Sequence, residues 1–168
     1  MSNPFANLPN APMPGDYGPN FKHGKYHVQT SLLLCKVSKN PKNPGAYFIA
    51  FECTILAQLE GCYTDSNEVG QRVSKVFMIQ AAGWEGVYAM GAFKALIANM
   101  LAVDFDLISD AHAMAITGST MQGAAFVPGD GTDAAGTELV VIVTDTDKTD
   151  KNGQPYTNLT FEPAPTDA

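Results

Sequence analysis

Basic and aromatic side chains recur together along several stretches of this 168-residue chain. Lys and Arg can neutralise phosphate groups, and aromatic rings can stack on bases, so the combination could form a nucleic-acid surface. Arg72 and Lys75 lie on one predicted strand of an acidic chain and are candidate phosphate contacts. The full set of candidate contacts is Lys25, Tyr26, Lys36, Lys39, Lys42, Tyr47, Arg72, Lys75, Phe77, Lys151 and Tyr156.

Each of these residue types also has a simpler role. An aromatic side chain on a strand more often packs in the core or against a neighbouring strand, and surface lysines near a loop are usually only solvated. Phe51 and Phe161 are assigned to the core, and Trp84 is expected to pack at the entry to a helix. Tyr47 and Tyr156 are the strongest stacking candidates among the aromatic residues.

The charge of the chain is unevenly distributed. The net charge of -7 disfavours nucleic-acid binding at first, because phosphate contacts depend on basic residues. Residues 1–80, however, hold seven Lys or Arg against five acidic residues, whereas residues 81–168 hold three against twelve. This segregation fits a domain with one basic face and an acidic remainder.

No motif in the sequence specifies an enzyme or a metal site. Asp145, Asp147 and Asp150 resemble the start of an EF-hand loop, but Asp150 stands where that loop requires Gly, and the bidentate Glu is missing. His23 and His27 lack the helical setting and intervening Glu of a zinc-protease motif. Phosphate-binding loops and nucleophile-elbow motifs are absent. We therefore expect a non-enzymatic protein without a cofactor or metal.

The three cysteines and the apolar pattern suggest a compartment. Cys35, Cys53 and Cys62 are odd in number and lack the C-x-x-C spacing, so reduced and mostly buried thiols are expected. No apolar run approaches the roughly 20 residues needed to cross a bilayer. The first residues lack a basic start and an apolar signal core. These features predict a cytoplasmic protein with no membrane partner.

Hydrophobic periodicity predicts a β-rich order of elements. Strand-like runs of β-branched and apolar residues are followed by a change to helical spacing, in which Met90, Phe93, Ile97 and Met100 recur every three or four residues. The pattern predicts strands at 25–37, 47–59, 71–80, 139–144 and 156–161, helices at 87–101 and 104–115, and a loop at 118–136. Asn152 and Gly153 supply a hairpin turn between the last two strands.

This order predicts a mainly β fold: a five-stranded OB-fold barrel with one or two helices between strands 3 and 4. In such a barrel the helix covers one end of the core. Residues 1–20, with five prolines, are expected to form an extended arm. Residues 21–163 form the predicted OB-fold domain, and residues 164–168 form a short tail.

Between about residues 25 and 163 the pattern resembles the OB-fold single-stranded-DNA-binding proteins of tailed bacteriophages. The resemblance is carried by NEVGQR at 67–72, GAFKALI at 91–97 and KNGQPYTN at 151–158. It implies a protein that coats single-stranded DNA during replication or recombination in the host cytoplasm, through basic grooves and exposed aromatic rings, without a metal. Many such proteins carry a strongly acidic tail that recruits partners, whereas residues 162–168 hold only two acids.

Two functions from different classes follow. The first is a sequence-tolerant single-stranded-DNA-binding protein that neutralises phosphates and stacks bases, possible partners being replication or recombination proteins. The second is a structural or adaptor β-protein of a virion or larger assembly, suggested by the proline-rich arm, the acidic surface and the lack of catalytic residues. The sequence leaves the oligomeric state open.

Overall fold

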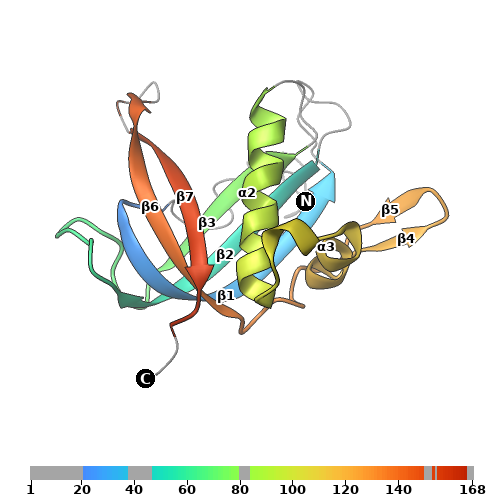
Figure 1. The fold of residues 1–168 in the computed structure, drawn as a ribbon, viewed down its shortest axis with the longest axis horizontal. Coiled ribbons are helices and arrows are strands. Elements are labelled where there is room, and N and C mark those ends of the chain that lie inside the picture. Colours follow the sequence, from blue (N-terminus) through green and yellow to red (C-terminus); the bar gives the residue numbers. More distant parts are fainter. Residues whose placement is uncertain (1–20, 38–46, 80–83, 150–152, 154, 166–168) are drawn as a thin grey trace, which may run out of the picture.

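In the computed structural model, residues 21–37, 47–79, 84–149, 153 and 155–165 are described. Strands predominate, as the periodicity predicts. The main sheet contains β1 (Gly24–Val37), β2 (Tyr47–Gln58), β3 (Arg72–Ile79), β6 (Glu138–Thr149) and β7 (Pro155–Pro163). Neighbouring strands are antiparallel in the order β3-β2-β1-β6-β7, so β3 and β7 are the two edges (Figure 1). The first three strands, which are consecutive in the chain and adjacent in the sheet, form a meander.

Alternation along the strands separates a core face from an outer face. On β2, Ile49, Phe51, Cys53 and Ile55 are almost fully buried and point into the main core, as expected of every second residue on a strand. We call the opposite side of the sheet the outer face. The residues of β7 alternate in the same way, because Leu159 is buried whereas Asn158 and Thr160 are exposed.

The long strand β1 is bent by two register shifts, at His27/Val28 and at Thr30/Leu32. Such irregularities increase the local bend of a strand. The first half of β1, from Gly24 to Gln29, pairs with β6, while β2 pairs along nearly its whole length. Beyond Gln29, the segment that precedes β6 runs along the same edge of β1 and bonds to it through the backbone. The Leu33 N–H, for example, donates to the Gly131 carbonyl oxygen over 2.8 Å.

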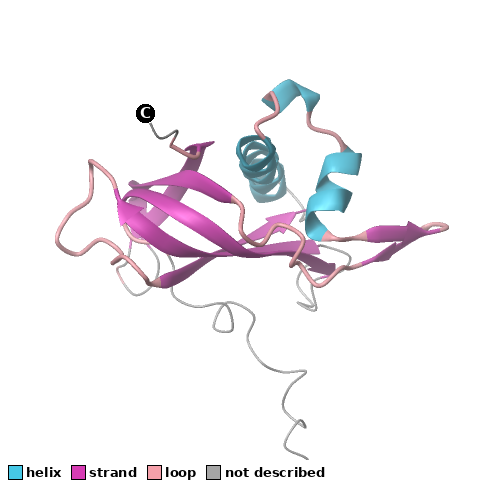
Figure 2. Ribbon diagram, turned by 90° about the horizontal axis from the view of Figure 1, so that it is seen from below, coloured by secondary structure: helices cyan, strands magenta, loops and turns pink. Residues whose placement is uncertain are grey.

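Helix α2 (Trp84–Leu101) packs against both edge strands, β3 and β7. Its buried face consists of Phe93, Leu96, Ile97 and Met100. Phe93, Ile97 and Met100 follow the predicted helical spacing, whereas Met90, predicted on the same face, is 40% exposed. Figure 2 shows the helices together on one side of the sheet. The helix begins three residues before the predicted start, so Trp84 lies in its first turn rather than in a preceding turn.

The prediction of a closed barrel is wrong for this structure. Hydrogen bonding runs from β3 to β7 without joining these two edges, so the described strands form an open, curved sheet. Closure would need backbone pairing between β3 and β7, whereas α2 packs against both strands instead. Side chains of the helix therefore complete the core where barrel pairing was expected.

The second predicted helix is divided. A short 3-10 helix, η2 (Phe105–Leu107), is followed by α3 (Asp110–Thr117). The break has a local cause, because Ile108 and Ser109 adopt extended backbone conformations and the Ser109 N–H donates to Nδ1 of His112 over 3.0 Å. Because the His112 side chain accepts the N–H of Ser109, Ser109 serves as the N-cap residue at which α3 begins.

The prediction of a structureless loop at 118–136 is wrong in its first part. Strands β4 (Thr120–Gln122) and β5 (Ala125–Val127) form a hairpin that projects beyond the main sheet (Figure 1). Gly123, at φ 62°, occupies the left-handed region that a tight turn requires. Gly118, at φ 69°, ends α3 in the same way and directs the chain into the hairpin.

Candidate nucleic-acid interface

Three of the predicted basic contacts share the outer face of the sheet. Lys25, Lys36 and Arg72 each lie next to a residue that points into the core: Tyr26, Cys35 and Val73. Because adjacent residues of a strand point to opposite faces, the three basic side chains project from the outer face. Cations on one face are the arrangement that contact with a phosphate backbone requires.

Arg72 is already engaged on that face. Its guanidinium forms an ion pair with Glu52, which lies on the neighbouring strand β2. The Arg72 side chain is 64% exposed, whereas that of Glu52 is only 10% exposed. Arg72 therefore presents donors to solvent while it also compensates a carboxylate that is largely removed from water. The arginine has a structural role besides any contact with a ligand.

Two other basic groups of β1, Lys25 and His27, are also paired. Lys25 Nζ lies 3.4 Å from a carboxylate oxygen of Glu162, and His27 Nε2 lies 2.8 Å from one of Glu138. These pairs are partly exposed, so each contributes little to stability. A phosphate that approaches Lys25 must compete with the carboxylate of Glu162. We therefore expect fewer effective phosphate contacts than the number of cations suggests.

Lys36 stands beside an apolar cluster on the outer face. It is exposed and has no ion pair within the described part of the chain. The cluster consists of Leu34, Phe48 and Ala50, which are buried and separate from the main core. Lys36 pairs directly with Phe48 in the register of β1 and β2. This end of the outer face therefore presents an exposed cation next to apolar side chains that are covered rather than open to solvent.

Lys75 differs from Arg72, with which the sequence analysis grouped it. The two are three positions apart on the strand, so they project from opposite faces, and Lys75 pairs with the core residue Phe51. Its ammonium lies 5.9 Å from the centroid of the Phe77 ring. Burial lowers the pKa of Lys75 below its ordinary value of 10.5. Contact between Lys75 and a phosphate stays a prediction, but the two residues cannot form one phosphate clamp.

Phe77 is buried in the main core, 5% exposed, so the prediction that its ring stacks on a base is wrong. It lies on the same face of β3 as Val73 and pairs with Ile49. An inward position leaves neither face of the ring accessible to a base. The simpler role of a strand aromatic, which is core packing, applies here.

Tyr26 is also a core residue, and the prediction that it stacks on a base is wrong. Its side chain is fully buried, and its hydroxyl accepts the backbone N–H of Asn67 over 3.0 Å. The same hydroxyl donates to the Lys22 carbonyl oxygen over 2.8 Å. Desolvation raises the pKa of Tyr26 above its ordinary value. The residue joins the start of β1 to the loop between β2 and β3.

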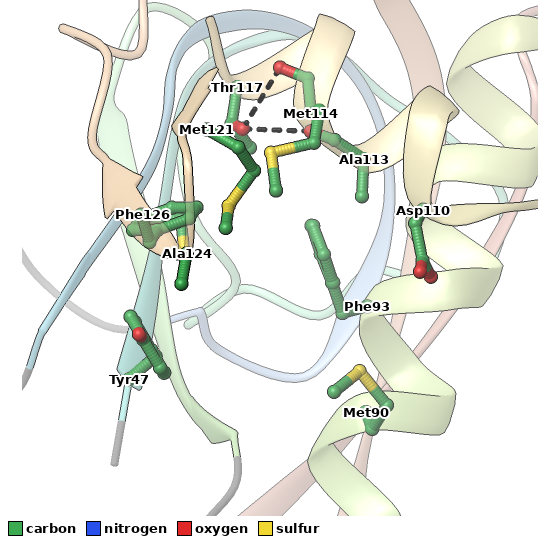
Figure 3. A pocket seen from close by; sticks show the side chains of 11 residues that line it. Tyr47, Met90, Phe93, Asp110, Ala113, Met114, Thr117, Met121, Ala124 and Phe126 are labelled. Carbon is green, nitrogen blue, oxygen red and sulfur yellow. Dashed lines mark hydrogen bonds between the residues drawn. The ribbon is translucent and has the colours of Figure 1, made fainter. Parts of the chain in front are cut away.

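Tyr47 lies at the rim of a pocket rather than on the outer face. It is half-buried, and its ring meets that of Phe126 edge to face, with centroids 5.2 Å apart. The pocket has a volume of about 380 Å³ and lies between β2, α2, α3 and the β4–β5 hairpin (Figure 3). Tyr47 remains accessible, but its neighbours are apolar and no basic residue lines the pocket.

Four predicted contacts are not located at side-chain level. Lys39, Lys42 and Lys151 lie outside the described residues. Tyr156 belongs to β7, but its side chain is not among those described. Their roles as phosphate or base contacts stay predictions.

Sequence reasoning missed Tyr63, which lies in the loop between β2 and β3. Its side chain is 60% exposed, and its ring packs against that of His23 with centroids 4.7 Å apart. Lys22, directly before His23, is exposed. An accessible ring that packs against a histidine, with an exposed lysine as the preceding residue of the chain, is suited to stack on a base. We call Lys22, His23 and Tyr63 the aromatic platform.

The aromatic platform is held by hydrogen bonds within and across the loop. The Tyr63 N–H donates to Ser66 Oγ over 2.8 Å, and this hydroxyl donates to the His23 carbonyl oxygen over 2.6 Å. Asn67, which is fully buried, accepts the Lys22 N–H at its side-chain oxygen over 2.8 Å. These bonds fix the positions of Tyr63 and His23 relative to each other, so a base would meet a preformed surface.

The polar residues around Tyr63 could have indicated this arrangement. Residues 60–70 are rich in turn formers, and none of the predicted contacts falls among them. A turn-rich loop that contains a Tyr between small polar residues is a place where an aromatic ring projects. Its pairing with His23, 40 positions earlier in the chain, had no local signal.

Acidic groups limit the positive potential near the platform. Nδ1 of His23 lies 3.8 Å from a carboxylate oxygen of Asp145 on β6. Lys22 has no ion pair among the described residues. The platform is therefore better suited to stacking than to dense phosphate contact.

The remaining chemistry of the described residues is sparse. No three His, Cys, Asp or Glu side chains in the described ranges are grouped closely enough to hold a metal ion. The cysteines are free: Cys35 and Cys53 are buried and Cys62 is half-buried, as predicted. Burial raises the pKa of the Cys35 thiol to about 11, which makes it a poor nucleophile. None of the helices found in the described part of the chain is both long and apolar enough to span a membrane.

Comparison with known proteins yields no family. The sequence matches no protein-family model, and a search of the curated proteins finds no significant match.

Proposed function

We propose that this chain is a sequence-tolerant single-stranded-DNA-binding protein of the OB type. Support comes first from the order of elements. Three antiparallel strands precede α2, and β6 and β7 follow it as a hairpin, with β1 next to β6 in the sheet. In an OB-fold the helix likewise lies between the third and fourth strands. Oligonucleotides commonly bind across the strands of such folds.

The observation that carries the proposal is the aromatic platform. Tyr63 is exposed, while its backbone and neighbours are held by hydrogen bonds that involve Ser66 and Asn67. The Tyr63 ring packs against His23 but leaves 60% of the side chain exposed, and stacking on a base would bury more of the ring. Stacking is tolerant of sequence because every base has a π-face.

The outer face supplies the second element of the proposal. Lys25, Lys36 and Arg72 would contact phosphates, but Lys25 and Arg72 carry carboxylate partners. Because these partners compete with phosphate, we expect a small number of phosphate contacts and a shallow dependence of affinity on salt. Such a protein would coat single strands exposed during replication or recombination.

A fluorescence titration with labelled oligo-dT in EDTA, at several salt concentrations, tests this function. Log affinity should fall linearly with log salt, with a slope of roughly -0.7 for each phosphate neutralised on a single strand. Absence of binding at low salt would contradict the proposal. It would favour the second candidate, an adaptor protein, which the acidic second half and the apolar pocket support.

A further inference from the structure

The pocket in Figure 3 is chemically unlike a site for nucleic acid. Its lining contains three aromatic rings, three methionines and one charged residue, Asp110. A pocket of about 380 Å³ falls at the small end of the range for sites that enclose an organic ligand. It is large enough for one bulky side chain. A phosphate would find no cation among the lining residues.

Met90 from α2, Met114 from α3 and Met121 from β4 converge on this space (Figure 3). Methionine adapts its shape to a partner, and its sulfur makes favourable contacts with aromatic rings. Tyr47, Phe93 and Phe126 supply further ring surface. A lining of sulfur and ring edges favours an aromatic occupant over an aliphatic one.

The mouth of the pocket exposes apolar surface to solvent. Met90 and Met121 are 40% and 50% exposed, and Ala124 at the hairpin turn is exposed as well. The β4–β5 hairpin, which supplies Met121 and Phe126, projects from the main sheet. Exposed apolar surface around a concave site is typical of protein-binding surfaces.

The charges near the pocket define the partner further. Residues 84–127 contain four acidic residues and one lysine, Lys94. The Lys94 ammonium lies 4.3 Å from the centroid of the Phe105 ring. Asp110 lines the pocket, and Asp104 and Asp106 on the connection before α3 are exposed. Asp110, the one charged residue among those that line the pocket, favours a cationic group over an anionic one at this position.

We propose that this pocket binds the aromatic side chain of a partner protein, presented by a segment in which Lys or Arg flanks that aromatic residue. The aromatic ring enters between the methionines, and a flanking cation meets Asp110. The proposal is independent of DNA binding, which belongs to the outer face and the aromatic platform. The test uses short capped peptides as probes for such a segment.

The full chain is labelled with ¹³C at the methionine methyl groups, and the peptides are acetyl-Lys-Phe-Lys-amide, acetyl-Glu-Phe-Glu-amide and acetyl-Lys-Ala-Lys-amide. The Lys-Phe-Lys peptide should shift the signals of Met90, Met114 and Met121 in a saturable manner. Met100 is buried in the main core and does not line the pocket, so its signal should stay unchanged. The Glu-Phe-Glu peptide should bind more weakly, and the Lys-Ala-Lys peptide should cause no shift.

Two variants separate the contribution of shape from that of charge. Ala124→Trp fills the mouth from an exposed position and should abolish the shifts, with the Met100 signal reporting an intact core. Asp110→Asn keeps the shape and should weaken Lys-Phe-Lys binding by about two- to fivefold, the range expected for one exposed ion pair.

Three results would overturn the proposal: no shift of the pocket methionines with Lys-Phe-Lys, equal binding of Glu-Phe-Glu, or unchanged binding by Ala124→Trp. A fourth is an oligo-dT titration that shifts the same three methionines, because the pocket would then belong to the nucleic-acid site. Loss of oligo-dT binding with intact peptide binding would contradict only the proposed function.

Discussion

The backbone N–H of Asn67 donates to the hydroxyl of Tyr26 over 3.0 Å, across 41 positions of sequence. Both residues are fully buried. This bond connects the start of β1 to the loop that carries Tyr63. Tyr26, which was expected on the surface, is therefore buried and helps to hold the loop in which Tyr63 is exposed.

Removal of that hydroxyl should destabilise the fold. Tyr26→Phe keeps the ring but leaves the Asn67 N–H buried without its acceptor, which should lower the free energy of unfolding by about 1–3 kcal/mol. Urea denaturation measures the change. Val69→Ala, at an exposed position of the same loop, is the control and should leave stability unchanged. Equal stability of Tyr26→Phe and the native chain would mean that water replaces the hydroxyl.

Tyr63→Ala should weaken oligo-dT binding by about 1–3 kcal/mol, because one stacked base is lost. The salt slope and the melting temperature should hardly change, since the ring is 60% exposed and contributes little to the core. Tyr63→Phe should retain most of the affinity. If Tyr63→Ala binds oligo-dT as the native chain does, the aromatic platform is not part of the interface.

Arg72→Ala should lower both affinity and stability. Loss of a phosphate contact should make the salt slope shallower by roughly 0.7. The variant also leaves Glu52, 10% exposed, without its cation, at a cost of about 1–3 kcal/mol in unfolding free energy. The double variant Arg72→Ala/Glu52→Gln removes the unpaired charge and should recover part of that stability without recovering the slope. A native melting temperature for Arg72→Ala would show that Glu52 is adequately hydrated.

Lys75→Met should raise the melting temperature at pH 7. Burial lowers the pKa of Lys75 in the folded state, so the charged ammonium opposes folding at every pH below that lowered value. This opposition fades as pH rises toward and beyond 10.5, because the amine then becomes neutral in both states. The advantage of the variant should therefore shrink between melts at pH 7 and pH 10.

Lys75→Arg is the control for this effect. Arginine keeps its charge at both pH values and should bring no pH-dependent gain. If Lys75→Met raises the melting temperature by the same amount at pH 7 and pH 10, the increase comes from packing alone and not from removal of the charge. Oligo-dT binding by Lys75→Met tests separately whether this cation contacts a phosphate.

Local pattern was sufficient for most of the elements. The runs around Ile49 and Val73 alternate or are β-branched, and Phe93, Ile97 and Met100 follow helical spacing, so the strands and the main helix could be predicted near their observed bounds. The short β4–β5 hairpin was missed because its two strands are only three residues long each. The opposite faces of Arg72 and Lys75 could also have been read from their odd spacing.

The sequence by itself determined which segments are strands and helices, because hydrophobic periodicity acts between residues a few positions apart. Tertiary structure alone decided that Tyr26 is buried beneath Asn67, that Tyr63 meets His23, and that α2 rather than strand pairing lies against β3 and β7. The contacts of Tyr26 with Asn67 and of Tyr63 with His23, and the packing of α2 against β7, join residues tens of positions apart. Such contacts are selected by the packing of the whole chain, and residue type and spacing leave no local record of them.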